Sequence, residues 1–219
     1  DRCELDMPWT FYNSSGEAMI QDGAMTIANN TNNRVVTATG ADPASLNGEA
    51  NLTFDGTTLT IPGQIAFPAT QSASANVNTL DDYEEGTWTP SFTDQSASAS
   101  ENQGYGNRIG TYTKIGKQVT FNMNLIISNL GCLATCQRAL IIGLPVTSGS
   151  SIATGNVHVG FAQSLNITAG HSVTGIVNSC GTQVTQYLWD GTAGPSLFLV
   201  SELSTGGGIE LTGHYIAAA

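Results

Sequence analysis

Basic residues are scarce in this sequence. The 219 residues include 6 Lys and Arg against 17 Asp and Glu, which gives a formal net charge of −11. No Lys or Arg lies between Arg34 and Arg108, whereas nine Asp and Glu fall in that interval. Proteins that bind the phosphate backbone do so through clustered cations. We therefore expect no nucleic-acid partner.

Long hydrophobic runs and cysteines are also few. No apolar run approaches the roughly 18 to 20 residues that a membrane helix needs, and the chain does not begin with a basic segment followed by a hydrophobic one. Four cysteines are too few for a disulfide scaffold at this length. Cys132 and Cys136 are close enough for a loop disulfide or can be free thiols, but a zinc site would need two further ligands nearby. The sequence predicts no membrane insertion, no metal and no cofactor.

Small and polar residues are abundant instead. Charged residues make up only 11% of the chain, apolar residues make up 40%, and Gly, Ser, Thr and Asn are frequent. Helices favour Glu, Lys, Leu and Ala, whereas Thr-rich and β-branched segments favour short strands and turns. The composition therefore predicts an all-β protein with enough apolar residues to bury a core.

The segment GEANLTFDGTTLTI, residues 48–61, has the pattern of a β-hairpin, and residues 16–27 resemble it. Asp-Gly between alternating apolar residues is a strong signal for a two-residue turn. This turn would place Leu52 opposite Leu59, Ala50 opposite Ile61 and Phe54 opposite Thr57.

An isolated hairpin cannot cover its own apolar face. We therefore predict that residues 1–67 form a stem of intertwined hairpins from several copies of the chain. The predicted oligomer interface consists of Ala50, Leu52, Phe54, Leu59 and Ile61.

Residues 68–87 are predicted to be a spacer that ends in an acidic turn. The small polar stretch PATQSASANVN is typical of a linker. In LDDYEEGTW, Thr79 can cap one helical turn with Asp82 at its third position, and Gly86 can end that turn. A strand is expected from Thr87, with Trp88 packed at its start, and Pro90 restricts this strand to the edge of a sheet.

Four carboxylates in this turn, those of Asp81, Asp82, Glu84 and Glu85, could donate oxygens to Ca²⁺. The stretch lacks the alternating acidic and glycine pattern of a calcium loop, and acidic residues suit the first turn of a helix. We expect the four carboxylates to face solvent without binding a metal.

Residues 88–219 contain about eight strand signals separated by Gly, Asn and Ser. In KQVTFNMNLIIS, residues 117–128, apolar residues occupy every second position from Val119 to Ile127. Ile115-Gly116-Lys117 makes a turn that pairs this strand with the preceding GTYTK. The pattern predicts an antiparallel, jelly-roll-like β-sandwich.

Tyr187, Trp189 and Asp190 are the candidate ligand-binding residues. Aromatic rings can stack on the face of a sugar, and the carboxylate of a neighbouring turn residue can accept hydrogen bonds from its hydroxyl groups. The alternative is that Tyr187 and Trp189, which share a strand face, are ordinary core residues, and that Asp190 only forms the turn in WDGT. Glycoside hydrolysis needs two carboxyls held across a cleft. The C-terminal region offers Asp94, Glu101, Asp190, Glu202 and Glu210, but Asp190 lies in a hairpin turn, and no nucleophile motif or phosphate-binding loop is present. We expect a protein that is not an enzyme.

Four segments taken in order resemble the fibre and tail-spike-type structural proteins of tailed bacteriophages: NLTFDGTTLTI, LDDYEEGTWTP, YTKIGKQVTF and LTGHYIA. The resemblance covers most of residues 48–219. It implies a homotrimeric virion protein that contacts other virion proteins through its N-terminal region and contacts the host surface, a glycan or another envelope component, through its distal domain. The resemblance does not identify any catalytic residue in this sequence.

The sequence leaves other functions open. A capsid-bound head fibre or decoration protein would share these features with a tail fibre. A polysaccharide-cleaving tail spike is a second alternative. A secreted bacterial adhesin with a sandwich fold is a third, which the missing signal peptide disfavours.

Overall fold

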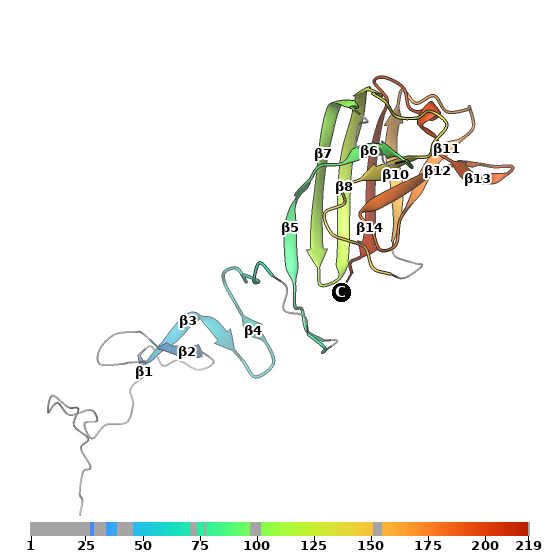
Figure 1. Ribbon diagram of the computed structural model, residues 1–219. Coiled ribbons are helices and arrows are strands. Elements are labelled where there is room, and N and C mark those ends of the chain that lie inside the picture. Colours follow the sequence, from blue (N-terminus) through green and yellow to red (C-terminus); the bar gives the residue numbers. More distant parts are fainter. Residues whose placement is uncertain are drawn as a thin grey trace, which may run out of the picture. The chain divides into compact units, whose positions relative to one another are not determined.

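The computed structural model describes residues 27–28, 34–38, 46–70, 74–76, 78–96, 102–150 and 155–218. The chain divides into two compact units, Asp1–Ala66 and Phe67–Ala219. Both units are built from β-strands (Figure 1). Within the described ranges, no helix has the length and apolar character needed to cross a membrane.

The first unit contains a small sheet around one long strand. Strand β3 (Leu46–Phe54) pairs with β1 (Ile27–Ala28) in parallel and with β2 (Arg34–Ala38) and β4 (Leu59–Thr60) in antiparallel orientation. The hairpin predicted for residues 48–61 is therefore present as β3 and β4. The similar segment at residues 16–27 lies almost wholly outside the described residues.

The turn of this hairpin is longer than the sequence predicted. Phe54 pairs with Leu59 rather than with Thr57. The reason is the side chain of Asp55, whose Oδ1 accepts hydrogen bonds from the backbone N–H groups of Thr57 (2.9 Å) and Thr58 (2.7 Å) and so draws both residues into the loop. These two bonds lower the pKa of Asp55. The predicted register is wrong by two positions, which leaves the same residues on the same face.

The apolar face of this hairpin is exposed in the described part of the chain. Phe54 is 50% exposed, Leu59 is 53% exposed and Ile61 is 38% exposed. Ala50 is also exposed, and Leu52 is half-buried. The predicted interface residues therefore present an apolar surface that the described part of the chain does not bury.

The second unit is a single ten-stranded sheet. Its strands are β5 (Tyr83–Trp88), β6 (Ser91–Asp94), β7 (Gly104–Ile115), β8 (Gln118–Asn129), β9 (Ala139–Ile142), β10 (Gly155–Gln163), β11 (Ser172–Val177), β12 (Gln183–Asp190), β13 (Gly194–Leu197) and β14 (Gly208–Ile216). The order across the sheet is β5-β7-β8-β14-β10-β11-β12-β9-β6, and β13 adds to β12 beyond the end of β9. All the pairings are antiparallel.

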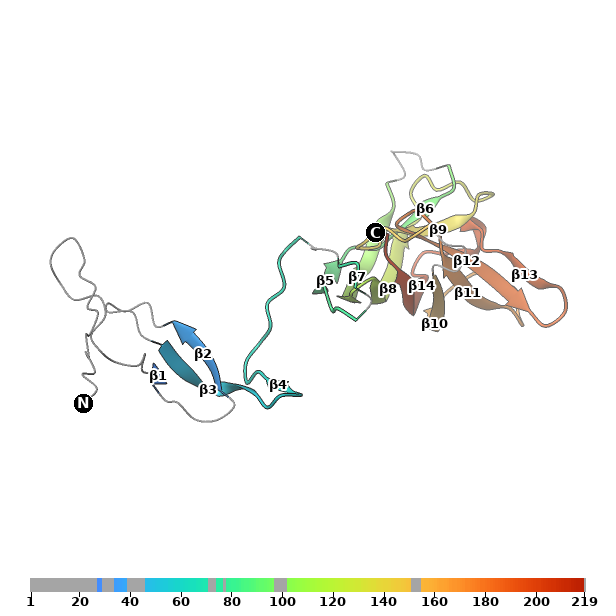
Figure 2. The ribbon, with the colours of Figure 1, turned by 90° about the horizontal axis from the view of Figure 1, so that it is seen from below.

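The sheet is curled over one core. Strands β5 and β6 follow each other in the chain, separated only by residues 89–90, yet they lie at the two ends of the strand order. The sheet must therefore curl until its ends approach each other, as Figure 2 shows. Tyr105 on β7 supports this closure, because its hydroxyl oxygen accepts a hydrogen bond from the backbone N–H of Phe92 on β6 (2.9 Å).

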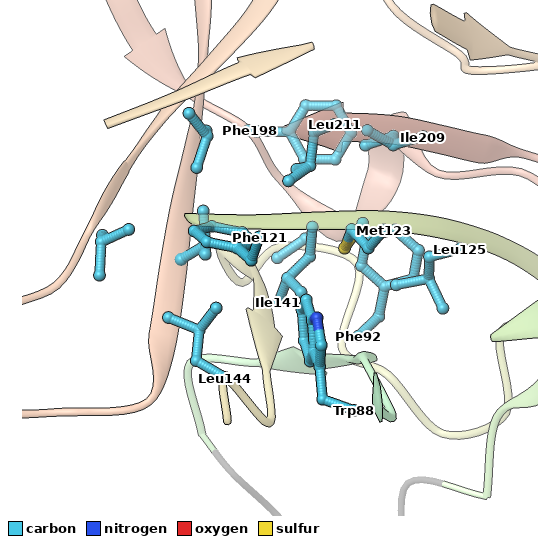
Figure 3. Close-up of a cluster of buried hydrophobic side chains, with 14 of the residues drawn as sticks. Trp88, Phe92, Phe121, Met123, Leu125, Ile141, Leu144, Phe198, Ile209 and Leu211 are labelled. Atoms are coloured by element: carbon cyan, nitrogen blue, oxygen red, sulfur yellow. The ribbon is translucent and has the colours of Figure 1, made fainter. Parts of the chain in front are cut away.

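Side chains from both ends of the sheet fill the space inside the curl. Figure 3 shows Trp88, Phe92 and Ile141 packed toward Phe121 and Met123. The rings of Trp88 and Phe121 meet edge to face, with centroids 5.8 Å apart.

The alternation predicted for residues 117–128 is confirmed by β8. Val119, Phe121, Leu125 and Ile127 are fully buried and Met123 is 4% exposed, while the residues between them face outward. The predicted turn at Gly116 is also present, and Gly116 takes a positive φ of 56° that favours glycine.

The predicted acidic helical turn is wrong. Residues Tyr83–Trp88 form the edge strand β5, with Glu84 opposite Lys114 and Glu85 opposite Thr113 on β7. Long-range pairing with β7 overrides the local capping signal, because each residue of β5 gains a ladder partner that one isolated helical turn cannot offer. The expected edge position and the burial of Trp88 are confirmed, but the strand ends at Trp88 instead of beginning near Thr87.

Asp82 does not face solvent as expected. It is buried and forms an ion pair with Lys114 in which the side chains are 8% and 7% exposed. Its backbone carbonyl also accepts a hydrogen bond from Gly116 N–H (2.9 Å). The segment that enters the second unit is therefore fastened to the turn between β7 and β8.

The all-β prediction is confirmed. The second unit is a curled antiparallel sheet, and the homotrimer and the jelly-roll sandwich remain predictions.

Candidate ligand-binding groove

The candidate site begins with the turn between β12 and β13. Asp190 Oδ1 accepts hydrogen bonds from the backbone N–H groups of Thr192 (2.7 Å) and Ala193 (2.5 Å), and Asp190 pairs with Gly194 at the end of the turn. Gly194 takes a positive φ of 81°. The local sequence DGTA thus repeats the turn chemistry of DGTT at Asp55, and the hairpin projects from the rest of the sheet (Figures 1 and 2).

Strand β12 places Tyr187 and Trp189 on its outer face. Gln186 is fully buried and Leu188 is 3% exposed, so both point into the core. Because side chains alternate along a strand, the two aromatic residues face outward. Trp189 is 51% exposed and Tyr187 is half-buried. The alternative that both aromatic residues belong to the core is wrong.

Neighbouring strands turn this aromatic pair into a groove. Tyr187 lies opposite Thr174 on β11 and opposite Leu197 on β13, and Trp189 lies opposite Pro195. The resulting open groove has a volume of about 440 Å³ and is lined by Thr174, Gly175, Ile176, Tyr187, Trp189 and Pro195. Its floor is apolar, and Thr174 provides a hydroxyl group on the β11 side.

Asp190 has partners within the protein. Besides the two turn bonds, its Oδ2 lies 3.4 Å from Nε2 of His171. The backbone N–H groups of Ala193 and Thr192 lower the pKa of Asp190, and His171 lowers it further. The carboxylate therefore holds the turn and the start of β11 together, and its predicted contact with a ligand hydroxyl stays a prediction.

Sequence analysis identified Tyr187, Trp189 and Asp190, and the structure brings all three to one end of the second unit. It did not identify Thr174, Ile176, Pro195 or His171. No local signal marks these residues, because they reach the groove only through the pairing of β11 and β13 with β12.

Elsewhere, the described residues hold no group of three or more His, Cys, Asp or Glu that could bind a metal ion. Glu84 accepts a hydrogen bond from the hydroxyl of Tyr112 and raises the pKa of that tyrosine to about 12. Cys132, Cys136 and Cys180 are free and exposed.

These features define an all-β module with a curled sheet and an exposed aromatic groove on its outer surface. Searches with protein-family models and among curated proteins find no match. Among solved structures, the crystal structure of the Dettilon tailspike protein (gp208) matches with a TM-score of 0.51 and 19% identity, over 61% of this chain and 24% of that chain. This chain thus spans about a quarter of the tailspike's length, and the similarity shows a fold shared with part of a phage tailspike.

Proposed function

We propose that this protein is a bacteriophage virion fibre protein that attaches the particle to the host cell surface without enzymatic activity. The observation that carries the proposal is the fold that the chain shares with part of a tailspike protein. The receptor would be a surface glycan or another envelope polymer.

The proposed assembly is a homotrimer that joins other virion proteins through residues 1–67. The uncovered apolar face of the β3–β4 hairpin supports this assembly, because Phe54 and Leu59 remain about half exposed in the single chain. Burying such side chains contributes about 25 cal/mol for each Å² removed from water. Three copies that cover one another's hairpins would gain this free energy.

The proposal of a non-enzymatic protein is supported by what the carboxylates of the second unit do. Asp94 accepts hydrogen bonds from the backbone N–H groups of Ser96 and Ala134, both at 2.8 Å. Glu202 accepts from the backbone N–H of Leu199, and Glu210 accepts from the side chain of Asn124. These three carboxylates hold groups of the protein itself, and none of them lines the groove, whereas a glycosidase places two carboxyls on either side of the glycosidic bond.

The test uses the purified full chain and a panel of bacterial strains. We expect the fluorescently labelled protein to attach to cells of a subset of strains and to leave their surface polysaccharide intact. Attachment to no strain would contradict the attachment role. Appearance of new reducing ends after incubation would show a polysaccharide-cleaving spike instead. Antibody labelling of intact particles, viewed by electron microscopy, would separate a tail fibre from a head fibre or decoration protein.

A further inference from the structure

Arg138 lies beside the aromatic groove. It directly precedes β9, which pairs with β12 so that Leu140 lies opposite Thr185. At Arg138 the chain leaves this register and bridges Leu199, two residues after the partner of Tyr187 on β13. The guanidinium carbon lies 6.0 Å from the centre of the Tyr187 ring, which is within cation–π range.

The charge of Arg138 is not neutralised within the described part of the chain. The ion pairs found there join Lys114 to Asp82 and His171 to Asp190. The Nε atom of Arg138 is buried and makes no hydrogen bond to any described residue. In a chain with a net charge of −11, a partly buried arginine without a carboxylate partner is unexpected, because burying an unpaired charge costs free energy.

The carboxylates of neighbouring elements are committed to other partners. Asp94, at the end of β6, accepts from Ser96 and Ala134 N–H groups, and Glu202 accepts from Leu199 N–H. At the other end of the groove, Asp190 is paired with His171. The groove therefore combines an apolar aromatic floor with one positive charge at the Tyr187 end.

We propose that this groove binds an acidic saccharide of the bacterial envelope, with one sugar ring stacked on Trp189 and a sugar carboxylate paired with Arg138. The inference rests on the proposed attachment function and names the site and the chemical class of its receptor. Trp189 presents a half-exposed indole on which the apolar face of a pyranose ring can stack, and Thr174 supplies a hydroxyl at the side of the groove.

The spacing suits a ligand longer than one sugar. Tyr187 and Trp189 are two positions apart on a strand, so their Cα atoms are about 7 Å apart, and Arg138 lies beyond Tyr187. An apolar peptide could cover the aromatic rings but would leave the guanidinium without an anion. A saccharide with a carboxylate satisfies both features, because an arginine–carboxylate pair can form two parallel charge-assisted hydrogen bonds.

The test compares four variants of the full chain. Trp189→Ala and Arg138→Gln change the groove. Phe161→Ala and Arg108→Gln are matched controls, because Phe161 on β10 is 53% exposed and Arg108 lies over the ring of Tyr105, 4.8 Å from its centre. Circular dichroism melting of each variant checks that it remains folded.

The probes are the surface polysaccharides released from each strain of the panel, used native and after chemical reduction of their carboxyl groups to alcohols. We expect the wild-type protein to bind a native polysaccharide. We expect the affinity to fall about tenfold or more on carboxyl reduction, on Arg138→Gln and on Trp189→Ala, and to stay near the wild-type value in both controls.

Unchanged affinity in folded Trp189→Ala and Arg138→Gln proteins would overturn the groove assignment and leave the attachment function standing. Attachment to intact cells without binding to any released polysaccharide would also overturn the groove assignment and leave the attachment function standing. Equal binding to native and carboxyl-reduced polysaccharide would overturn the acidic class of the ligand. Failure to bind both cells and polysaccharides would overturn the attachment function together with the inference.

Discussion

Replacing Lys114 by methionine removes the cation from the buried ion pair with Asp82. The methionine keeps most of the apolar length of the side chain, so the main change is the loss of charge. Asp82 would then be a carboxylate with 8% of its side chain exposed and without its cation. The segment that enters the second unit would lose its ion pair to β7 and keep the backbone hydrogen bond from Gly116.

The burial of the pair decides the size of the effect. An exposed ion pair contributes about 0 to 1 kcal/mol, but removing one partner of a buried pair costs about 3 to 5 kcal/mol because the other charge is left uncompensated. For a unit of this size, each kcal/mol lowers the melting temperature by about 2 to 4 °C, so we expect a decrease of roughly 6 to 20 °C.

Thermal unfolding of the full chain, followed by circular dichroism, measures this change. Lys117→Met is the matched control, because Lys117 is an exposed lysine in the adjoining turn. The double variant Asp82→Leu with Lys114→Met should regain most of the lost stability, since it removes both charges. A Lys114→Met protein that melts within about 2 °C of the Lys117→Met protein would refute the reasoning.

Three further changes test other parts of the structure. Gly110→Ala should destabilise the second unit by about 1 to 3 kcal/mol or more in urea unfolding, because the added Cβ would lie only 2.2 Å from the nearest atom of the Trp88 indole. Gly160→Ala is the control: its added Cβ would have no atom within 4 Å, so it should cost less than half as much. Leu52→Asp should prevent assembly because it places a charge on the predicted intersubunit face. Sedimentation velocity should show smaller particles for Leu52→Asp than for the control Asn51→Asp, which changes the polar face. Equal sedimentation of the two variants would contradict the predicted packing of the stem. The pKa of Tyr112 is raised from 10.0 to about 12, chiefly by its hydrogen bond to a glutamate, so its stabilising contribution is present below pH 10 and is lost as the pH rises toward 12. Phenolate absorbance should therefore show that Tyr112→Phe removes a group that titrates near pH 12, and loss of a group near pH 10 would argue against that hydrogen bond.

Local patterns predicted the strands well where one face is uniformly apolar. From Val119 to Ile127 every second residue is apolar, Ile126 being the one apolar residue between them, and the structure buries that face. The Asp-Gly turn after Phe54 was predicted in position but not in length, because Asp55 uses its side chain to accept two backbone hydrogen bonds and lengthens the loop. The acidic turn was mispredicted because the partner that holds Glu84 and Glu85 in a strand lies on β7, about 30 residues further along the chain.

The candidate groove shows the same limit. The sequence places Tyr187 and Trp189 on one face of a strand, but it cannot tell which face is buried. Their aromatic character favours the core, yet the structure buries Gln186 and Leu188 instead. The position of Arg138 could not be predicted either, because it depends on the pairing of β9 with β12 and on the bridge from Arg138 to Leu199.

The sequence alone determined that the chain forms strands, where its tight turns fall and which residues share a face, because alternation and turn chemistry act over a few neighbouring residues. Only the tertiary structure decided which faces became core, which carboxylate was buried against Lys114, and which aromatic rings were left exposed beside an arginine that has no carboxylate partner among the described residues. These choices depend on strands that are distant in sequence and meet only when the sheet curls over its core.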